Sequence, residues 1–197
     1  AVAVPAYAGI PVTQREITST MTIVTGHESP DKARTDLDWD ALAKRIGTLI
    51  FYMGARNLPV IVEKLIHHGR SQDTPIALIQ WGTTPAQRTL VGTLDDIVSR
   101  ARTDSFSSPV LIIVGEVVAL RRHLNWFESK PLFGTRVLVT RAKDQSGDLS
   151  EALIRMGATM PYQSCEQSKL LCPAGYVMRL CGQPRSMEQR WVRGLIV

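Results

Sequence analysis

Apolar residues in the first 127 positions follow two alternating patterns. Short continuous apolar runs are typical of strands that are buried on both faces, whereas apolar residues repeating every three or four positions are typical of amphipathic helices. The runs predict strands over 19–25, 48–53, 75–81, 88–92 and 110–114, and the repeats predict helices over 38–46, 57–68, 94–102 and 116–125. This alternation predicts an α/β fold in which helices flank a largely parallel or mixed sheet.

Acidic residues mark the expected starts of two helices. Asp38 stands directly before an apolar repeat, where an N-cap is expected. Asp95 and Asp96 fall in the first turn of the helix predicted over 94–102, where the helix dipole favours negative charge.

The periodic pattern is interrupted after residue 127. The stretch ESKPLFG predicts a linker, because charge, Pro and Gly occur together. A buried strand over 135–140 and a helix over 148–156 follow, and one strand and one helix cannot bury their own faces. The expected organisation is therefore a first domain over 1–127, a linker over 128–134, the start of a second α/β domain over 135–158 and a tail over 159–197.

The tail has no helix or strand period, and its Cys, Arg and Gln content departs from that of the preceding residues. Two explanations stay open for this irregular segment: a shift of reading frame after about Ala158, and a divergent part of the second domain. The chain begins at Ala1 rather than Met, directly in a motif. We expect a fragment whose upstream portion is missing.

The net charge of +5 is unevenly distributed. Up to Phe127 there are 13 Lys and Arg against 12 Asp and Glu, which leaves 10 against 6 for the remainder. The excess lies around the linker and tail without interleaved aromatic residues, so we expect no nucleic-acid partner. No apolar run approaches the length of about 20 residues that spans a bilayer, and we expect no membrane partner and a cytoplasmic protein.

Cysteine and histidine positions do not suggest a metal site. The cysteines are Cys165, Cys172 and Cys181. Their spacing matches neither a CxxC pair nor a zinc ribbon, and their odd number argues against a disulfide framework, so we expect free thiols. The pairs His27-Glu28 and His67-His68 do not converge on one ion, and no metal ligand is assigned.

The stretch LIQWGTTPAQRTLVGTL over 78–94 is the strongest candidate for a ligand-binding segment. A strand breaks there into a glycine turn and a polar loop before a second strand begins. Four other motifs accompany it: AYAGIPVTQR over 6–15, TGHE over 25–28, TLIFYMG over 48–54 and LIIVGEVVALRRHLNWF over 111–127.

In this order and spacing, the motifs resemble the C-terminal half of the uroporphyrinogen-III C-methyltransferases, a branch of the tetrapyrrole methylase family. The resemblance covers residues 1–127. Residues 130–158, KPLFGTRVLVTRAKDQSGDLSEALIRMGA, resemble the opening of the uroporphyrinogen-III synthases. Together they imply a bifunctional parent protein.

The resemblance implies an enzyme that uses S-adenosyl-L-methionine to transfer two methyl groups to uroporphyrinogen III, giving precorrin-2 for sirohaem and cobalamin. It also implies a homodimer in the intact enzyme. In this family the groups near the substrate belong to the N-terminal half. We therefore assign no catalytic residue in this chain and expect it to be inactive alone.

The resemblance places the cofactor between two α/β domains, with Met53 and Gly82 as the main contacts of this half. Further contacts expected in the adenosine pocket are Tyr52, Thr83, Pro109 and Val110. The chemistry is suitable, since Met53 offers a polarisable thioether, Gly82 has no Cβ to obstruct approach, and strand ends are where open α/β sheets bind ligands. A sulfonium also favours a site without a nearby side-chain cation. Without the resemblance, Met53 reads as core filler and Gly82 as a turn glycine.

One position departs from the family pattern. The family usually has His after the Ile-Pro-Val-Thr run, where this sequence has Gln14. Glutamine forms hydrogen bonds but does not titrate near neutrality, which removes an acid–base role. Arg15 is a candidate for binding a substrate carboxylate through two hydrogen bonds, with a solvated arginine at a strand edge as the alternative.

Two other functions stay open at this stage. This half of the family's fold also contributes to the dimer interface, so the chain is alternatively a non-catalytic dimerisation or assembly module. A methylase acting on another precorrin or on RNA is the second alternative.

Overall fold

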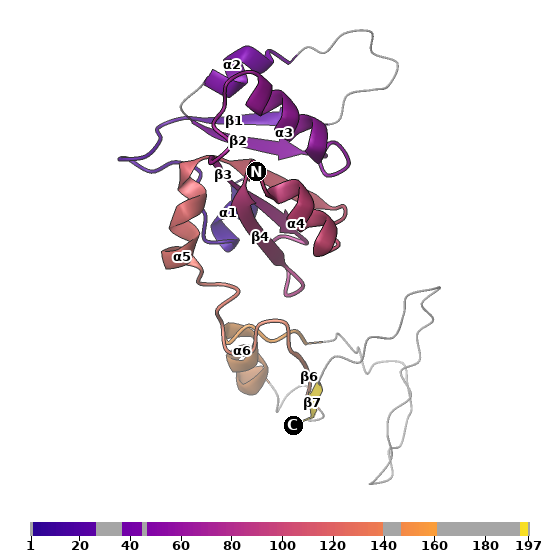
Figure 1. Ribbon diagram of the computed structural model, residues 1–197. Helices are drawn as coiled ribbons and strands as arrows, with labels where there is room; N and C mark the ends of the chain where they lie inside the picture. The colour runs from indigo at the N-terminus through magenta and orange to yellow at the C-terminus, as the bar shows by residue number, and fades with distance from the viewer. Residues whose placement is uncertain (1, 27–36, 45–46, 140–146, 161–193, 197) are drawn as a thin grey trace.

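The computed structural model describes residues 2–26, 37–44, 47–139, 147–160 and 194–196. They form a larger unit around one sheet and a smaller unit, joined by the segment that follows α5 (Figure 1). No helix in these ranges is long and apolar enough to cross a membrane. The elements of the larger unit are α1 (Ala3–Tyr7), β1 (Met21–Thr25), α2 (Trp39–Lys44), β2 (Thr48–Tyr52), α3 (Leu58–His67), β3 (Pro75–Gln80), β4 (Arg88–Thr93), α4 (Ile97–Thr103), β5 (Val110–Val114), η1 (Glu116–Leu120) and α5 (Arg121–Leu124).

The sheet is mixed, with strand order β1-β2-β5-β3-β4. β1 pairs with β2 in parallel, whereas β5 is antiparallel to both β2 and β3, and β3 forms an antiparallel hairpin with β4. The predicted mixed α/β fold is therefore confirmed. Because β2 and β3 are both antiparallel to the strand between them, their carboxyl ends lie at the same edge of the sheet, beside the start of β5.

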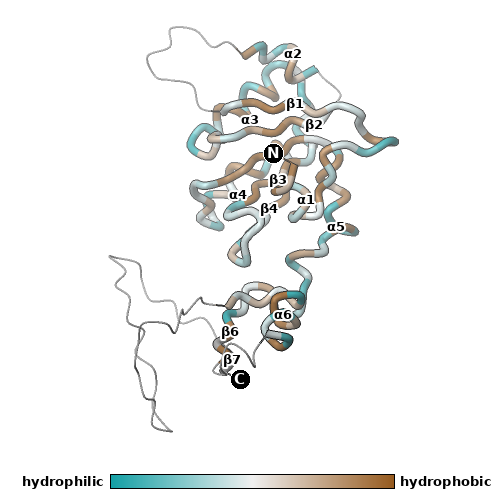
Figure 2. Tube along the Cα trace, turned by 180° about the vertical axis from the view of Figure 1, so that it is seen from behind, coloured by the Kyte–Doolittle hydropathy of each residue, from teal (hydrophilic) through white to brown (hydrophobic). Residues whose placement is uncertain are grey.

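The strands are continuously apolar because both faces of the sheet are buried. In β2, Leu49 and Phe51 belong to a cluster with α2, α3 and α4, and Ile50 points to the other face. That second face is covered by the residues that follow α1 and by η1, with Ala8 and Val117 fully buried. Figure 2 shows the hydrophobic strands in the interior, flanked by helices of mixed character.

Most of the predicted elements occur within three residues of their expected bounds. The N-cap at Asp38 is confirmed, since Asp38 Oδ1 accepts a hydrogen bond from the Ala41 N–H at 2.9 Å. The paired strands predicted around the 78–94 motif form the hairpin of β3 and β4, in register from Pro75 opposite Thr93 to Gln80 opposite Arg88.

The helix predicted over 94–102 begins later than expected. The Leu94 and Asp95 amides donate instead to the carbonyls of Thr74 and Gln72, which keeps both residues outside the helix. Asp96 occupies the N-cap position, and its Oδ1 accepts a hydrogen bond from the Thr93 N–H at 2.8 Å. The placement of two acidic residues in the first turn was therefore wrong.

The single helix predicted over 116–125 is also wrong, because the chain forms the 3-10 helix η1 and then the short α5. Val117 and Val118 are both buried, and η1 packs against β3. The tighter 3-10 turn places both side chains in the cluster that covers this face of the sheet.

The smaller unit contains β6 (Arg136–Leu138), α6 (Gly147–Arg155) and β7 (Gly194–Ile196). Val137, Leu153 and Ala158 form its buried cluster. β7 pairs with β6 in parallel, so residues 194–196 are a strand within the tail that the sequence pattern left irregular. An apolar run this short carries no readable period. The predictions for His27, Glu28 and the three cysteines lie outside the described residues.

Candidate functional site

A cavity of about 590 Å³ opens at the edge where β2 and β3 end and β5 begins. This volume lies in the range of small-molecule sites, which is about 300–1,000 Å³. Most of its lining is apolar, and its polar side chains are few. The cavity is lined by Val4, Tyr52, Met53, Arg56, Ile79, Trp81, Gly82, Thr84, Ser108, Pro109, Val110 and Leu111.

Five of the six residues predicted to contact a cofactor line this one cavity. They are Met53, Gly82, Tyr52, Pro109 and Val110. The sixth, Thr83, lies between two lining residues, and its backbone N–H donates to Gln87 Oε1 at 2.7 Å. The strand ends that the sequence motifs marked as separate candidates are thus brought together by the sheet order.

The backbone beside the cavity is strained at three positions. Among the described residues, four non-glycine residues have positive φ, and three of them lie at or beside the cavity: Met53 at 52°, Trp81 at 52° and Thr83 at 69°. This region of backbone space is uncommon for residues other than glycine, and each instance costs about 1–3 kcal/mol. Such residues concentrate at binding sites because the surrounding structure holds them there.

The strained turns leave two large apolar side chains open to the cavity. Met53 is 66% exposed and Trp81 is 48% exposed, although both follow strands that are almost completely buried. An apolar surface at a concave site is a feature of ligand binding rather than of the core. Core filling, the alternative interpretation of Met53, does not agree with its exposure.

Gly82 has a packing reason to be glycine. A Cβ built at this position would collide with the Val4 side chain, since α1 lies directly beneath the loop. The absence of a side chain therefore lets α1 approach the loop. This packing reason adds to the two expected from the sequence, which are the approach of a ligand and a turn.

Arg56 is the main lining residue that the sequence argument missed. It is exposed, and it makes no hydrogen bond or ion pair with any residue in the described part of the chain. Arg56 therefore places a side-chain cation at this cavity, whereas a sulfonium favours a site without one. Arg56 follows the Tyr-Met-Gly motif by two residues, and only its place at the same strand end signals it.

Buried Gln80 supports the opposite wall of the cavity. It is 5% exposed, and its Nε2 donates to the Ser107 carbonyl at 2.6 Å. Ser108 and Pro109, which follow, line the cavity. Gln80 thus ties the end of β3 to the segment that leads into β5.

Arg15 does not line the cavity. It is exposed in a turn in which the Gln14 N–H donates to the Thr18 carbonyl at 2.9 Å. The Gln14 side chain accepts a hydrogen bond from the Glu16 N–H at 2.8 Å, so it stabilises this turn locally. The predicted substrate contact of Arg15 stays a prediction.

The fold and the cavity define an α/β domain with a cavity of small-molecule size, and sequence comparison relates it to one family. Residues 1–98 match the family described as tetrapyrrole (corrin/porphyrin) methylases. This part of the chain is therefore similar to the tetrapyrrole methylases, the family whose motifs it resembles.

The chain is also similar to two curated methyltransferases. Uroporphyrinogen-III C-methyltransferase of Bacillus subtilis (strain 168) is 39% identical over 159 residues, which cover 81% of this chain and 33% of that protein. The S-adenosyl-L-methionine-dependent uroporphyrinogen III methyltransferase of Methanosarcina barkeri (strain Fusaro / DSM 804) is 50% identical over 120 residues, covering 61% of this chain and 47% of that protein. The chain spans less than half the length of either relative.

A solved structure supports the fold. Uroporphyrin-III C-methyl transferase from Thermus thermophilus, complexed with S-adenyl homocysteine, is 26% identical with a TM-score of 0.50. The match covers 59% of this chain and 50% of that chain.

Proposed function

We propose that this chain is part of an S-adenosyl-L-methionine-dependent enzyme that methylates uroporphyrinogen III to precorrin-2, and that it supplies one wall of the cofactor site. The observation that carries the proposal is the cavity at the ends of β2 and β3, where five predicted cofactor residues meet. The two curated relatives are methyltransferases of uroporphyrinogen III by name, which supports this substrate.

The cavity suits the proposed cofactor in size and in chemistry. Met53 and Trp81 offer exposed apolar surface for a thioether and an adenine. When bound, the cofactor supplies an activated methyl group. Arg56 would bind a carboxylate, which both the cofactor and uroporphyrinogen III possess.

The role of these residues is to orient rather than to transfer protons. Alignment of donor and acceptor accounts for most of the acceleration when the group to be transferred is already activated. Tyr52, Pro109 and Val110 would exclude water from the apolar wall. No residue here is assigned as an acid or a base, and we propose that the catalytic groups belong to a segment outside this chain.

We also propose that the smaller unit is the start of a uroporphyrinogen-III synthase domain, with the first domain over 1–127 and the second over 135–158. The Bacillus subtilis relative has a similar sequence beyond the first domain, which supports this proposal. It leaves only 38 of the 197 residues unmatched (197 minus 159), so it includes residues 39–159 wherever it begins.

The test is a chimera in which the part of the Methanosarcina barkeri enzyme that this chain does not cover precedes Ala1. Calorimetric titration with S-adenosylhomocysteine should give saturable binding by the chimera. Met53→Ala should weaken binding at least about tenfold through loss of thioether contact. The matched control is Met21→Ala, since Met21 is also exposed, at 40%, but lies on β1 away from the cavity.

Product analysis separates the remaining possibilities. Mass spectrometry after incubation with S-adenosylmethionine and uroporphyrinogen III should show the addition of two methyl groups. Cofactor binding with an unmethylated product would reject this substrate and favour another precorrin or RNA. Absence of binding by both the chain and the chimera would favour the assembly module instead.

A further inference from the structure

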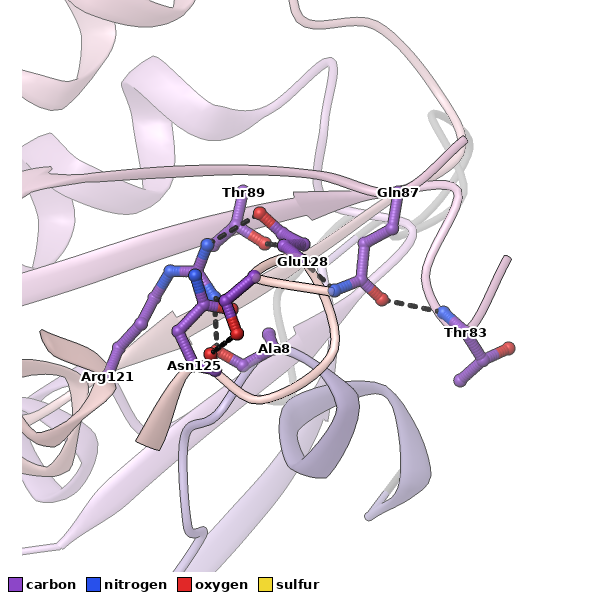
Figure 3. A network of polar contacts seen from close by, with 8 residues as sticks. Ala8, Thr83, Gln87, Thr89, Arg121, Asn125 and Glu128 are labelled. Atoms are coloured by element: carbon purple, nitrogen blue, oxygen red, sulfur yellow. Dashed lines mark hydrogen bonds and ion pairs between the residues drawn. The ribbon is translucent and has the colours of Figure 1, made fainter. Parts of the chain in front are cut away.

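A partly buried polar network connects the cavity loop, residues 81–87, to the residue that opens the predicted linker, Glu128 (Figure 3). Glu128 Oε1 accepts hydrogen bonds from Gln87 Nε2 at 2.8 Å and from Thr89 Oγ1 at 2.6 Å. Its Oε2 pairs with Arg121 Nη2 at 2.6 Å. The side chains of Glu128 and Arg121 are only 15% and 13% exposed, so each depends on the other for compensation of its charge.

The network determines how Gln87 faces the cavity loop. Gln87 is 3% exposed, and a buried side-chain amide has one accepting and one donating end. Because Glu128 accepts from the Gln87 nitrogen, Gln87 Oε1 is turned toward the loop, where it accepts from the Thr83 N–H at 2.7 Å. Thr83 is one of the strained residues beside the cavity, with φ at 69°.

The other end of the network reaches α1. Arg121 Nη1 donates to the Ala8 carbonyl and to Asn125 Oδ1. Ala8 directly follows α1, the helix that presents Val4 beneath Gly82. The Arg121–Glu128 ion pair is therefore connected both to the loop and to the helix beside it.

We propose that Glu128 is a positioning residue for the cavity: through Gln87 it holds the turn over 81–83 in its strained geometry, and through Arg121 it holds α1 beneath that turn. Glu128 does not touch the cavity itself, since it is not among the lining residues. The part of the chain that forms and supports the cavity then extends to Glu128. A chain that ends at residue 127 would lose the support of the loop. The identity of the bound ligand rests on the proposed function, whereas the positioning role of Glu128 rests only on the contacts described above.

Amide hydrogen exchange, followed by nuclear magnetic resonance on the 197-residue chain, tests the geometry without any ligand. Glu128→Ala should accelerate exchange of the Thr83 amide at least about tenfold, because its acceptor is no longer oriented. Amides in the centre of the sheet, such as Leu78 and Ile112, should keep their wild-type rates. The matched control is Glu63→Ala, which removes an exposed carboxylate on α3.

A second variant keeps the test decisive if Glu128→Ala does not fold. Gln87→Met cuts the connection to Thr83 but leaves the Arg121–Glu128 pair intact, and it should accelerate Thr83 exchange to a similar extent. In the double variant the two effects should not multiply, because both remove the same contact. Unchanged Thr83 exchange in Gln87→Met, or equal acceleration at Thr83 and in the sheet centre, would overturn the positioning role.

The ligand is tested separately in the chimera. Glu128→Ala should weaken S-adenosylhomocysteine binding about tenfold, with Glu63→Ala unchanged. If Thr83 exchange responds as expected but wild-type chimera does not bind S-adenosylhomocysteine, the positioning role stands and the proposed cofactor is wrong. If the chimera binds and neither exchange nor affinity responds to Glu128→Ala, the positioning role is wrong and the proposed function stands.

Discussion

A methyl group added at Gly82 should destabilise the larger unit, because α1 already fills the space it would enter. The added Cβ would overlap Val4 Cγ1 and lie 2.9 Å from Val4 Cγ2. Gly82 is not among the residues with positive φ, so alanine brings no backbone strain there. The cost of Gly82→Ala is then that of overpacking, about 1–3 kcal/mol.

Shortening Val4 should remove most of that cost. Val4→Ala alone loses about 1 kcal/mol through the apolar groups it no longer buries, but it also removes both colliding carbons. The double variant should therefore unfold with a deficit near that of Val4→Ala alone, rather than the sum of the two. Urea denaturation followed by circular dichroism measures all three variants, provided that the m-values agree.

An additive result would refute this reasoning, since Val4 would then not be the obstacle. Gly147→Ala is the matched control, because no heavy atom of the described residues lies within 4 Å of a Cβ built there. The same variants distinguish the two explanations of the glycine. If the double variant in the chimera regains stability but binds S-adenosylhomocysteine more weakly than Val4→Ala alone, Gly82 is also needed for the backbone to approach the ligand.

Three further predictions concern single side chains. Arg70→Met should lower the free energy of unfolding by about 1–3 kcal/mol in urea denaturation. Arg70 Nη2 donates to the Gly47 carbonyl at 3.2 Å, and the variant leaves this acceptor unsatisfied. An unchanged denaturation midpoint would contradict this prediction. Thr48→Val should be neutral or stabilising in the same assay, since the buried Thr48 hydroxyl has no hydrogen-bond partner among the described residues, and a loss above about 1 kcal/mol would show a missed partner. In the chimera, Arg56→Gln should raise KM for the cofactor or for uroporphyrinogen III about tenfold with little change in kcat, as expected for loss of a carboxylate contact, whereas exposed Arg122→Gln on α5 should change neither.

The strands and long helices were predictable because both faces of the sheet are buried. Leu49, Ile50 and Phe51 are all fully buried, and their continuous apolar run is the direct consequence. The helix α3 was equally readable, because its buried residues Leu58, Ile61, Val62 and Leu65 recur on one face. In these elements, the hydropathy of each residue matches its own burial.

The network around Glu128 was not readable, because its members are far apart in the sequence. Glu128 and Gln87 are 41 residues apart, and each looks like an ordinary surface residue in its own segment. Arg56 was missed for the opposite reason: an exposed arginine is the most common kind, and only the cavity gives it a role. Contacts between segments that are distant in the sequence decide both cases, and the local pattern contains no information about them.

The strained residues imply that the cavity wall is formed before any ligand binds. Met53, Trp81 and Thr83 together cost about 3–9 kcal/mol, which is comparable with the net stability of a typical domain, about 5–15 kcal/mol. Such a cost persists only where neighbouring contacts leave the backbone no alternative, and Gln87 and Val4 supply such contacts to the turn over 81–83. A ligand entering this cavity therefore does not have to order the loop, and less of its binding energy is lost. Relaxing the support that Gln87 gives should weaken binding without removing a ligand contact, because Gln87 does not line the cavity.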